Sequence, residues 1–271
     1  PIEEIFSHID SKPLGSASLA QVHRATLVTG EDVAVKVQRP GVSETMAQDV
    51  SIMLSLAKVA AKLFPDAQIV DFKGVVEELW DTFEAETDSL VEARNLAAFK
   101  RFSKPYKYMD CPAPYPELCT EHVVVMDYID GISVSHPKQL LAAGYDLKEI
   151  GTKLVDNYAT QILDEGFFHA DPHPGNIIVR GGQIVLIDLG MTGRLDQRTR
   201  TVLKDMLFAV AQQDSPALAD SLLRFANTSP DAEDYPALLD DLDMVVQEYG
   251  KVDLAKTYRD DYMHELHKEF P

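Results

Sequence analysis

The sequence His169-Ala-Asp-Pro-His-Pro-Gly-Asn176 is followed twelve residues later by Asp188-Leu-Gly190, and these two stretches decide how the rest of the chain is interpreted. Asp171, Asn176 and Asp188 form a set of oxygen ligands made of two carboxylates and one carboxamide. Mg²⁺ takes oxygen ligands in proteins, usually one or two carboxylates together with substrate phosphates. The set therefore predicts a magnesium site, with one carboxylate left over as a catalytic base.

A hairpin is predicted to bring Asp188 back to this loop. Strand-like residues 177–179 and 183–187 flank the turn Gly181-Gly182, a strong hairpin signal. The alternative, a solvated acidic loop, does not explain such a hairpin. Within the loop, Pro172 and Pro174 are expected to stiffen the backbone. His169 is expected to have a structural role, as a hydrogen-bonding partner of the loop.

Lys36 lies within a second predicted hairpin, in the strand-like run Val33-Ala-Val-Lys-Val37. A lone lysine in a strand commonly lies on a solvent-facing edge. Here, however, the hairpin context matches that of a lysine that holds phosphates. The small-residue turn Gly15-Ser-Ala-Ser18 precedes the hairpin and would let the backbone approach a ligand, although a plain tight turn explains it equally well.

Three acidic residues are predicted to lie on one helix that runs from Asp71 towards Phe99, namely Glu86, Asp88 and Glu92. Asp88 and Glu92 are four residues apart, so they face the same way and repel each other. An exposed acidic face is the ordinary explanation. The functional alternative is that one of these acids holds Lys36 against the phosphates of a nucleotide.

The remaining pattern predicts an α+β fold. Helices are expected over residues 2–10, 44–64 and 146–166, where Asp146 and Glu149 resemble a capping box, and a buried strand over 123–126. From residue 198 onward the pattern is helical. The first 130 residues thus mix strands and helices and the rest is mostly helical, so we predict domains at 1–130 and 131–271, with a ligand cleft between them.

Composition narrows the function classes. The chain of 271 residues has a net charge of −19, which argues against a nucleic-acid partner and against docking on an anionic membrane through charge alone. Its only cysteines, Cys111 and Cys119, form no disulfide framework and suit a reducing compartment. No signal peptide and no membrane-spanning stretch is visible. The chain begins with Pro1, so we expect a fragment of a longer protein.

Four stretches together resemble the UbiB/AarF/ADCK family of atypical protein-kinase-like proteins, and the resemblance covers nearly the whole chain. They are Pro13-Leu-Gly-Ser-Ala-Ser-Leu-Ala-Gln-Val-His-Arg-Ala25, similar to the family's Ala-rich loop; Val33-Ala-Val-Lys-Val-Gln-Arg-Pro-Gly41; Glu86-Thr-Asp88 with Glu92-Ala-Arg-Asn95, similar to its Glu-x-Asp helix; and the two loops quoted first. Two features depart from the family. Its Lys-x-Gly-Gln motif is absent from this sequence, and Gly15-Ser16 stands where alanines are usual.

The resemblance implies a two-lobed protein-kinase-like fold, with an antiparallel sheet and helices in the N-lobe and a mostly helical C-lobe. Its cofactors would be ATP and Mg²⁺. Lys36 would contact the ATP phosphates and pair with Glu92, Asp171 would be the catalytic acid/base, and Asn176 and Asp188 would hold Mg²⁺. The expected nucleotide contacts are Ala17, Ser18, Lys36, Met126 as gatekeeper, Asp127, Tyr128 and Ile129 as adenine hinge, Asn176 and Asp188. The remaining family-motif residues are Glu86, Asp88 and His169.

The resemblance also implies a kinase or ATPase linked to prenylquinone (ubiquinone) or isoprenoid-lipid metabolism. Its partners would be prenyl lipids or lipid-biosynthesis enzymes. It would be cytoplasmic or peripheral to the inner face of a membrane, with membrane association through segments outside this chain. Two alternatives stay open. One is a small-molecule phosphotransferase of the aminoglycoside or choline type, against which the Ala-rich loop and Glu-x-Asp helix argue. The other is a nucleotide-binding pseudokinase scaffold.

Overall fold

The computed structural model describes residues 1–16, 19–42, 48, 50–56, 74, 80, 88–228 and 234–249. The chain divides into two compact units, one made of Pro1–Tyr158 with His169–Gly193 and the other of Ala159–Phe168 with Arg194–Pro271. This division reflects compactness alone, so the lobes expected at 1–130 and 131–271 stay a prediction. Antiparallel strands and helices together give the α+β class that the sequence predicted.

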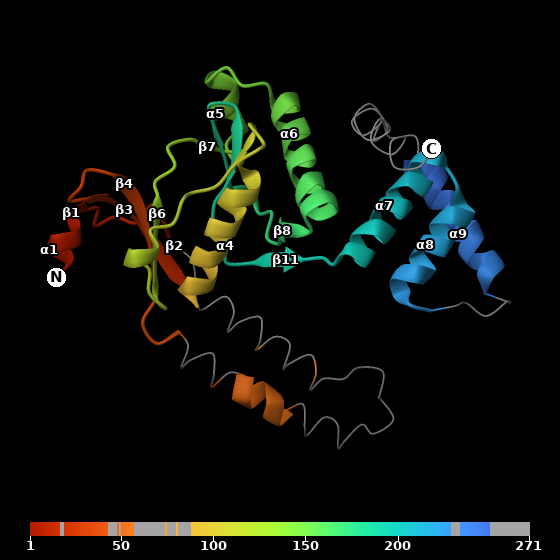
Figure 1. Cartoon of the computed structure of the whole chain (residues 1–271), viewed down its shortest axis with the longest axis horizontal. Helices are drawn as coiled ribbons and strands as arrows, with labels where there is room; N and C mark the ends of the chain where they lie inside the picture. Colours follow the sequence, from red (N-terminus) through yellow and green to blue (C-terminus); the bar gives the residue numbers. More distant parts are fainter. Residues whose placement is uncertain are drawn as a thin grey trace. The chain divides into compact units, whose positions relative to one another are not determined.

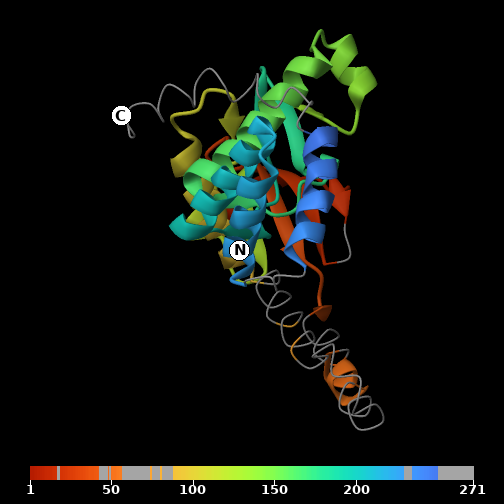
Figure 2. The ribbon, with the colours of Figure 1, turned by 90° about the vertical axis from the view of Figure 1, so that its right-hand side faces the viewer.

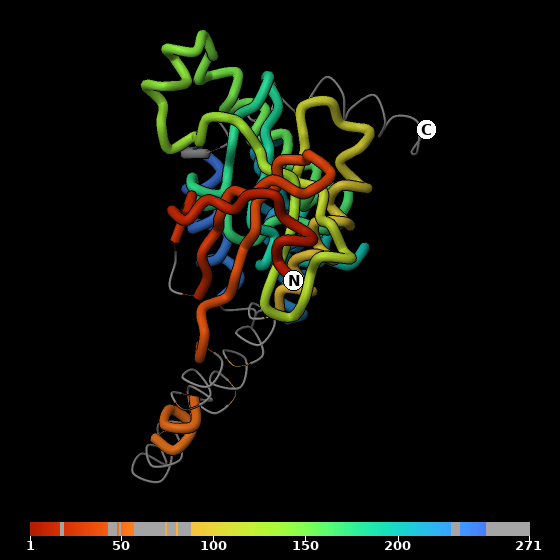
Figure 3. Tube along the Cα trace, turned by 90° about the vertical axis from the view of Figure 1, so that its left-hand side faces the viewer, coloured from red at the N-terminus to blue at the C-terminus, as the bar shows by residue number. Residues whose placement is uncertain are grey.

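Branched residues build the larger sheet of the first unit. The order of its strands is β1 (Phe6–Ile9), β3 (Ala20–Leu27), β4 (Asp32–Gln38) and β6 (Val123–Asp127), and β2 (Gly15–Ser16) pairs with β3. All these pairings are antiparallel, and Figure 3 shows β3 and β4 side by side in red and orange. Val33, Val35 and Val125 are buried together in the core of the sheet. The predicted Lys36 hairpin is therefore present, with Lys36 opposite Val22.

Strand β1 corrects the helix expected over residues 2–10. Helix α1 (Ile2–Ile5) ends after one turn, and Phe6 begins a strand that pairs with β3. Phe6 and Ile9 pack against the buried cluster of this sheet. Burial against residues far along the chain outweighs the local helical pattern here, as tertiary context commonly does.

Helix α4 (Ser89–Ser103) begins directly after Asp88, within the helix expected from Asp71 towards Phe99, most of whose first part lies outside the described residues. Asp88 has an extended backbone, and its carboxylate accepts a hydrogen bond from the Leu90 N–H at 2.9 Å, which makes it the N-cap of the helix. A helix that continues through Asp88 is therefore wrong, and Asp88 and Glu92 do not form one acidic face. Glu92 is buried, and α4 packs beside β6 (Figure 1).

A second sheet carries the hairpin that leads to Asp188. Its strand order is β5 (Met109–Asp110), β10 (Gln183–Leu186), β9 (Ile177–Arg180) and β7 (Ile132–Ser133). Strands β9 and β10 form the hairpin that the sequence predicted, and both glycines of its turn, Gly181 and Gly182, have positive φ, as a two-residue hairpin turn requires. Strand β5 joins β10 in parallel, with Met109 opposite Ile184. Residues from both sides of position 130 thus share one sheet.

Helices also follow β5 and β7 along the chain. They are η1 (Pro116–Leu118), α5 (Pro137–Ala142) and α6 (Leu147–Ala159). Asp146 caps α6 by accepting from the Lys148 N–H at 2.8 Å, whereas Glu149 pairs with Lys153 at 2.7 Å. Only half of the expected capping box therefore forms. Further on, β8 (Phe167–His169) pairs with β11 (Thr192–Arg194).

The second unit is helical, as the sequence predicted from residue 198 onward. It contains the π-helical turn η2 (Thr160–Glu165), α7 (Gln197–Gln212), α8 (Ser215–Ala226) and α9 (Tyr235–Tyr249). Gly166 ends η2 in the left-handed conformation, with φ of 63°. The helices α7, α8 and α9 pack around Leu218, Ala219 and Val246 (Figure 2). Among the residues that the structure describes, no helix combines the length and apolar content needed to span a membrane.

Candidate active site

Lys36 is the centre of a charged cluster in the first unit. Its Nζ lies 2.8 Å from Glu92 Oε2 and 2.9 Å from Asp188 Oδ1. Strand β4 supplies the lysine, α4 supplies the glutamate, and the residues after β10 supply the aspartate. The structure therefore brings together three residues that are far apart in the sequence.

Burial and charge act in opposite directions on this cluster. Burial lowers the pKa of Lys36, but the adjacent Glu92 and Asp188 carboxylates outweigh it, so the pKa is raised. Burial raises the pKa of Glu92, and the Lys36 ammonium only partly offsets this. Burial also raises the pKa of Asp188, but the Lys36 ammonium outweighs it and the net pKa is lowered. At neutral pH Lys36 therefore stays charged between the two acids.

The backbone around Asp188 is held in an uncommon conformation. Asp188 has φ of 62°, a left-handed geometry that costs a non-glycine residue free energy. The Gly190 N–H donates to Asp188 Oδ1 at 3.4 Å, and Asn95 Nδ2 on α4 donates to the Leu189 carbonyl at 3.0 Å. Asn95 thus links α4, which carries Glu92, to the Asp188-Leu-Gly190 loop. The sequence analysis assigned Asn95 no role, although it lies in the quoted Glu92-Ala-Arg-Asn95 motif.

The loop 169–176 presents Asp171 to solvent and holds it by a side-chain hydrogen bond. Asn176 Nδ2 donates to Asp171 Oδ2 at 2.9 Å. Beneath them His169 is buried, its Nδ1 accepts from the Asp171 N–H at 3.1 Å, and its Nε2 lies 3.3 Å from the Ile187 carbonyl. These contacts fit a neutral imidazole protonated at Nε2, and burial lowers the pKa of His169. His169 thus joins the Asp171 loop to the chain leading into Asp188.

His173 has a local structural function. Its Nδ1 accepts from the Gly175 N–H at 3.0 Å and caps the short helix η3 (Pro174–Asn176). Pro174 occupies the first position of this helix, where the missing N–H carries no cost. This turn determines the position of Asn176.

The expected hinge residues lie at the end of β6. Met126 and Ile129 are apolar and buried. The Asp127 carboxylate accepts from the Ala113 N–H at 3.0 Å, and the Tyr128 N–H donates to the Asp32 carbonyl at 3.1 Å. These two groups are therefore engaged within the protein, so their assignment to nucleotide contacts stays a prediction.

Three of the expected site residues, Ala17, Ser18 and Glu86, lie outside the described residues. Asp88 serves as the N-cap of α4 and makes no contact with Lys36 among the described contacts. One site residue was missed besides Asn95. Burial, together with the nearby Asp171 carboxylate, raises the pKa of Tyr158 to about 12. No sequence pattern distinguishes Tyr158 from an apolar helix position.

The oxygen donors present fit a hard divalent cation. The hydrogen bonds that Asp188 accepts from Lys36 and Gly190 both go to Oδ1, which leaves Oδ2 for another ligand. Asn176 donates with Nδ2 and so keeps its carbonyl oxygen. The described residues contain no group of three or more His, Cys, Asp or Glu side chains that could hold a metal. Two protein oxygens completed by phosphates and water are what Mg²⁺ prefers.

The sequence of this chain is similar to those of several kinase-like proteins. A family model described as the ABC1 atypical kinase-like domain matches residues 1–222. The probable protein kinase UbiB of Pseudomonas fluorescens is 38% identical over 218 residues, which cover 79% of this chain and 41% of that protein. The chloroplast protein ACTIVITY OF BC1 COMPLEX KINASE 8 of Arabidopsis thaliana is 34% identical over 234 residues, covering 84% of this chain and 31% of its own.

Two further matches extend the comparison. A protein of Clostridium pasteurianum, described as uncharacterized in the hydrogenase 1 5′ region, is 41% identical over 213 residues, covering 79% of this chain and 40% of that protein. The solved structure of Rv3197 with erythromycin, from Mycobacterium tuberculosis, matches with a TM-score of 0.70 and 25% identity over 90% of this chain and 62% of its own. The chain therefore spans 31% to 41% of the length of these three curated relatives.

Proposed function

Because the chain belongs to the ABC1 atypical kinase-like family, we propose that it is an ATP- and Mg²⁺-dependent phosphotransferase or ATPase. The observation that carries the proposal is the position of Lys36 between Glu92 and Asp188, at 2.8 Å and 2.9 Å. A surface lysine has no need of two carboxylates. A lysine that binds phosphates needs such partners, because the carboxylates fix its position and keep it charged before the nucleotide binds.

Lys36 has a donor left for the nucleotide. An ammonium group has three N–H donors, and two of them are directed to Glu92 and Asp188. The third would donate to a phosphate oxygen. Because Glu92 is buried, its carboxylate is held rigidly by packing, and the lysine it pairs with is held in turn.

Asp171 would act as the general base on the acceptor hydroxyl. The acceptor oxygen bonds to the γ-phosphorus, the bond from phosphorus to the β–γ bridging oxygen breaks, and Asp171 takes the proton of the acceptor hydroxyl. Its hydrogen bond from Asn176 holds the carboxylate in place while its exposed side remains open to the acceptor. When water is the acceptor, the products are ADP and phosphate.

Asn176 and Asp188 would hold Mg²⁺, which, when bound, neutralises the negative charge that develops on the transferred group. This assignment uses the two oxygens that the internal hydrogen bonds leave open. It also explains why Asp188 faces Lys36, since both would act on the same phosphates.

The acceptor belongs to the same proposal at a finer level. The family resemblance supports a hydroxyl compound of prenylquinone (ubiquinone) or isoprenoid-lipid metabolism, with lipid-biosynthesis enzymes as partners. It also supports a cytoplasmic location peripheral to a membrane, with membrane attachment through segments outside this chain. Incubation with [γ-³²P]ATP and either prenyl-phenol analogues in vesicles or soluble amino-alcohols tests this choice. Labelling of the amino-alcohols alone would favour the aminoglycoside or choline type of enzyme instead.

Two substitutions test the assigned roles by Mg²⁺-dependent ATP turnover. Asp188→Asn should abolish turnover, because it removes the charge on the metal ligand. Asp171→Asn should slow turnover by about 10²–10⁴-fold, the usual contribution of a general base, while ATP binding measured by calorimetry stays within about threefold of the parent chain. Asp240→Asn, an exposed change on α9, is the matched control and should leave both unchanged.

Three outcomes would contradict the proposal. Full turnover in Asp188→Asn would remove the metal role, and unchanged turnover in Asp171→Asn would remove the base. ATP binding by the parent chain with no hydrolysis or transfer, with or without lipid, would identify a pseudokinase scaffold.

A further inference from the structure

Positive charge gathers at one end of α4, within a chain whose net charge is −19. Residues 93–109, between Glu92 and Asp110, include five basic side chains and no acidic one. Four of them, Lys100, Arg101, Lys104 and Lys107, line one cleft, which we name the α4 cleft. It is separate from the Lys36 cluster, because none of its lining residues is Lys36, Glu92, Asp171, Asn176 or Asp188.

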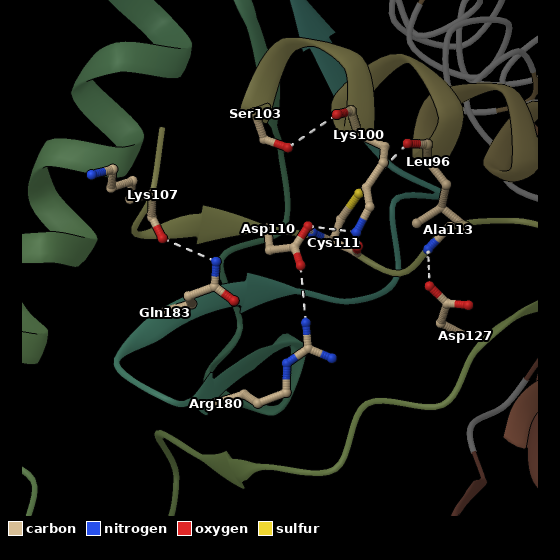
Figure 4. Close-up of polar contacts among 10 residues, drawn as sticks. All are labelled: Leu96, Lys100, Ser103, Lys107, Asp110, Cys111, Ala113, Asp127, Arg180 and Gln183. Carbon is tan, nitrogen blue, oxygen red and sulfur yellow. Dashed lines mark hydrogen bonds and ion pairs between the residues drawn. The ribbon is translucent and has the colours of Figure 1, made fainter. Parts of the chain in front are cut away.

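The α4 cleft is a concave site with a volume of about 580 Å³. Its walls come from the end of α4, the chain that leads into β5, the proline-rich segment before β6, and Gln183 of β10. Figure 4 shows how these elements are joined, since Gln183 Nε2 donates to the Lys107 carbonyl at 2.9 Å. A basic hollow with partly apolar walls concentrates its electric field more than a flat surface does.

Among the described residues that line the cleft, the one acid already has partners. Asp110 Oδ1 lies 2.6 Å from Lys100 Nζ, and its Oδ2 lies 2.9 Å from Arg180 on β9 (Figure 4). The Cys111 N–H donates to the same carboxylate at 2.9 Å. Asp110 therefore has no capacity left to neutralise further cations.

Three cations of the cleft remain without a counter-charge in the described part of the chain. The side chains of Arg101, Lys104 and Lys107 are exposed, and no ion pair or hydrogen bond joins them to any described residue. Basic side chains commonly follow the C-terminal end of a helix because they complement its dipole. That effect accounts for Arg101 in the last turn, but it fades beyond the helix end and so does not account for Lys107 or for the hollow between them.

We propose that the α4 cleft binds a phosphate ester or diphosphate group. A tetrahedral phosphate offers several acceptor oxygens to the fork of Arg101 and the ammonium groups of Lys104 and Lys107, which makes charge-assisted hydrogen bonds favourable. Because the cations lie around one hollow of about 580 Å³, a compact group can contact several of them at once, whereas an extended acidic peptide would spread its charges beyond them. This binding does not depend on the proposed catalytic activity.

Titration calorimetry with inorganic pyrophosphate, in EDTA and low salt, tests the proposal. The triple variant Arg101→Gln/Lys104→Gln/Lys107→Gln should bind at least tenfold more weakly than the parent chain. The variant Lys12→Gln/Lys138→Gln/Lys148→Gln removes the same charge at exposed positions and should bind within about twofold of the parent. Lys36→Met distinguishes the two phosphate sites, because pyrophosphate that bound beside Lys36 instead would be lost in this variant and kept in the triple cleft variant.

Several results would overturn the proposal. One is a parent chain that binds neither pyrophosphate nor acidic vesicles. Another is an equal loss of pyrophosphate binding in both triple variants, and a third is a loss of pyrophosphate binding in Lys36→Met alone. Binding of a hexaglutamate peptide as tight as that of pyrophosphate would also overturn the preference for phosphate.

A vesicle arm identifies the source of the phosphate. A lipid headgroup would be supported if the parent chain floats with phosphatidylcholine vesicles that contain phosphatidic acid but not with vesicles of phosphatidylcholine alone. This flotation should be lost in the triple variant Arg101→Gln/Lys104→Gln/Lys107→Gln. Pyrophosphate binding without flotation would support a soluble phosphorylated compound. Both results support the shared phosphate chemistry.

Discussion

Replacing Lys36 by Met removes the cation from a cluster that contains two carboxylates. Glu92 would then be buried without its ion-pair partner, close to Asp188. The change that costs the least free energy is protonation of Glu92, whose ordinary pKa is 4.5. Protonation at pH 7 costs about 3.4 kcal/mol, because each pH unit above 4.5 adds about 1.4 kcal/mol. The free energy of unfolding should therefore fall by up to about 3 kcal/mol at pH 7, in line with the usual cost of breaking a buried pair.

This cost should depend on pH in a defined direction. In the variant, the folded pKa of Glu92 lies above its unfolded value, so the folded chain binds the extra proton and its stability decreases as pH rises from 4.5 through the folded pKa. The difference from the parent chain should shrink by up to about 2.7 kcal/mol between pH 7.5 and 5.5.

Urea unfolding followed by circular dichroism measures this difference, and hydrogen exchange of the β4 amides assigns the transition to the first unit. The double variant Lys36→Met/Glu92→Gln is the matched control, because a neutral glutamine removes the titration. A Lys36→Met variant whose stability loss is the same at both pH values, or is below about 0.5 kcal/mol, would refute the idea that Lys36 compensates a buried charge.

Three further predictions concern other parts of the first unit. Burial lowers the pKa of His169 below 6.5, so the unfolded chain binds the extra proton. The free energy of unfolding should therefore decrease as the pH falls below 6.5, by at most about 1.4 kcal/mol per pH unit. In His169→Asn the urea midpoint should fall less at pH 5.5 than it does in the parent chain, and an identical fall would contradict this. Burial raises the pKa of the Cys111 thiol to about 12, so iodoacetamide should leave it unmodified at pH 8 until urea unfolds the chain; mass spectrometry that finds rapid labelling of the folded chain would contradict this. A Cβ at Gly131 would lie 2.7 Å from the Val179 carbonyl oxygen, so Gly131→Ala should lower the free energy of unfolding by about 1–3 kcal/mol. A Cβ at Gly151, within α6, meets open space, so Gly151→Ala should raise the free energy of unfolding by about 0.5–1 kcal/mol. Equal melting temperatures for the two variants would contradict the packing argument.

Local patterns predicted the elements that carry the site. Two glycines between branched residues predicted the β9–β10 hairpin, because positive φ is required at both turn positions. The alternating valines around Lys36 predicted β4. The kinase-like fold implied by the resemblance is confirmed by the family match over residues 1–222. Here the sequence succeeds because short-range geometry and a characteristic motif point to the same structure.

Contacts between distant residues could not be predicted in the same way. Asn95 reaches the Leu189 carbonyl across 94 positions of sequence, and no periodicity encodes such a pair. The start of α4 was missed because Asp88 suits a helix cap as well as an acidic helix face, and only the extended backbone at this residue distinguishes the two. Phe6 and Ile9 match a helix by spacing, but they form a strand because β3 offers them a partner.

The parallel pairing of β5 with β10 has a consequence for how the chain matures on the ribosome. Met109 lies opposite Ile184, so this ladder cannot close until the segment that contains residue 184 has left the exit tunnel. At the usual speed of translation, the 75 residues from Asp110 to Ile184 take roughly 4–15 s to make. Throughout that interval Met109 and its neighbours lack their sheet partner and expose apolar surface. Stalled nascent chains in which residue 184 is still inside the tunnel should therefore recruit chaperones more strongly than longer chains from which residue 193, the end of the first unit, has emerged.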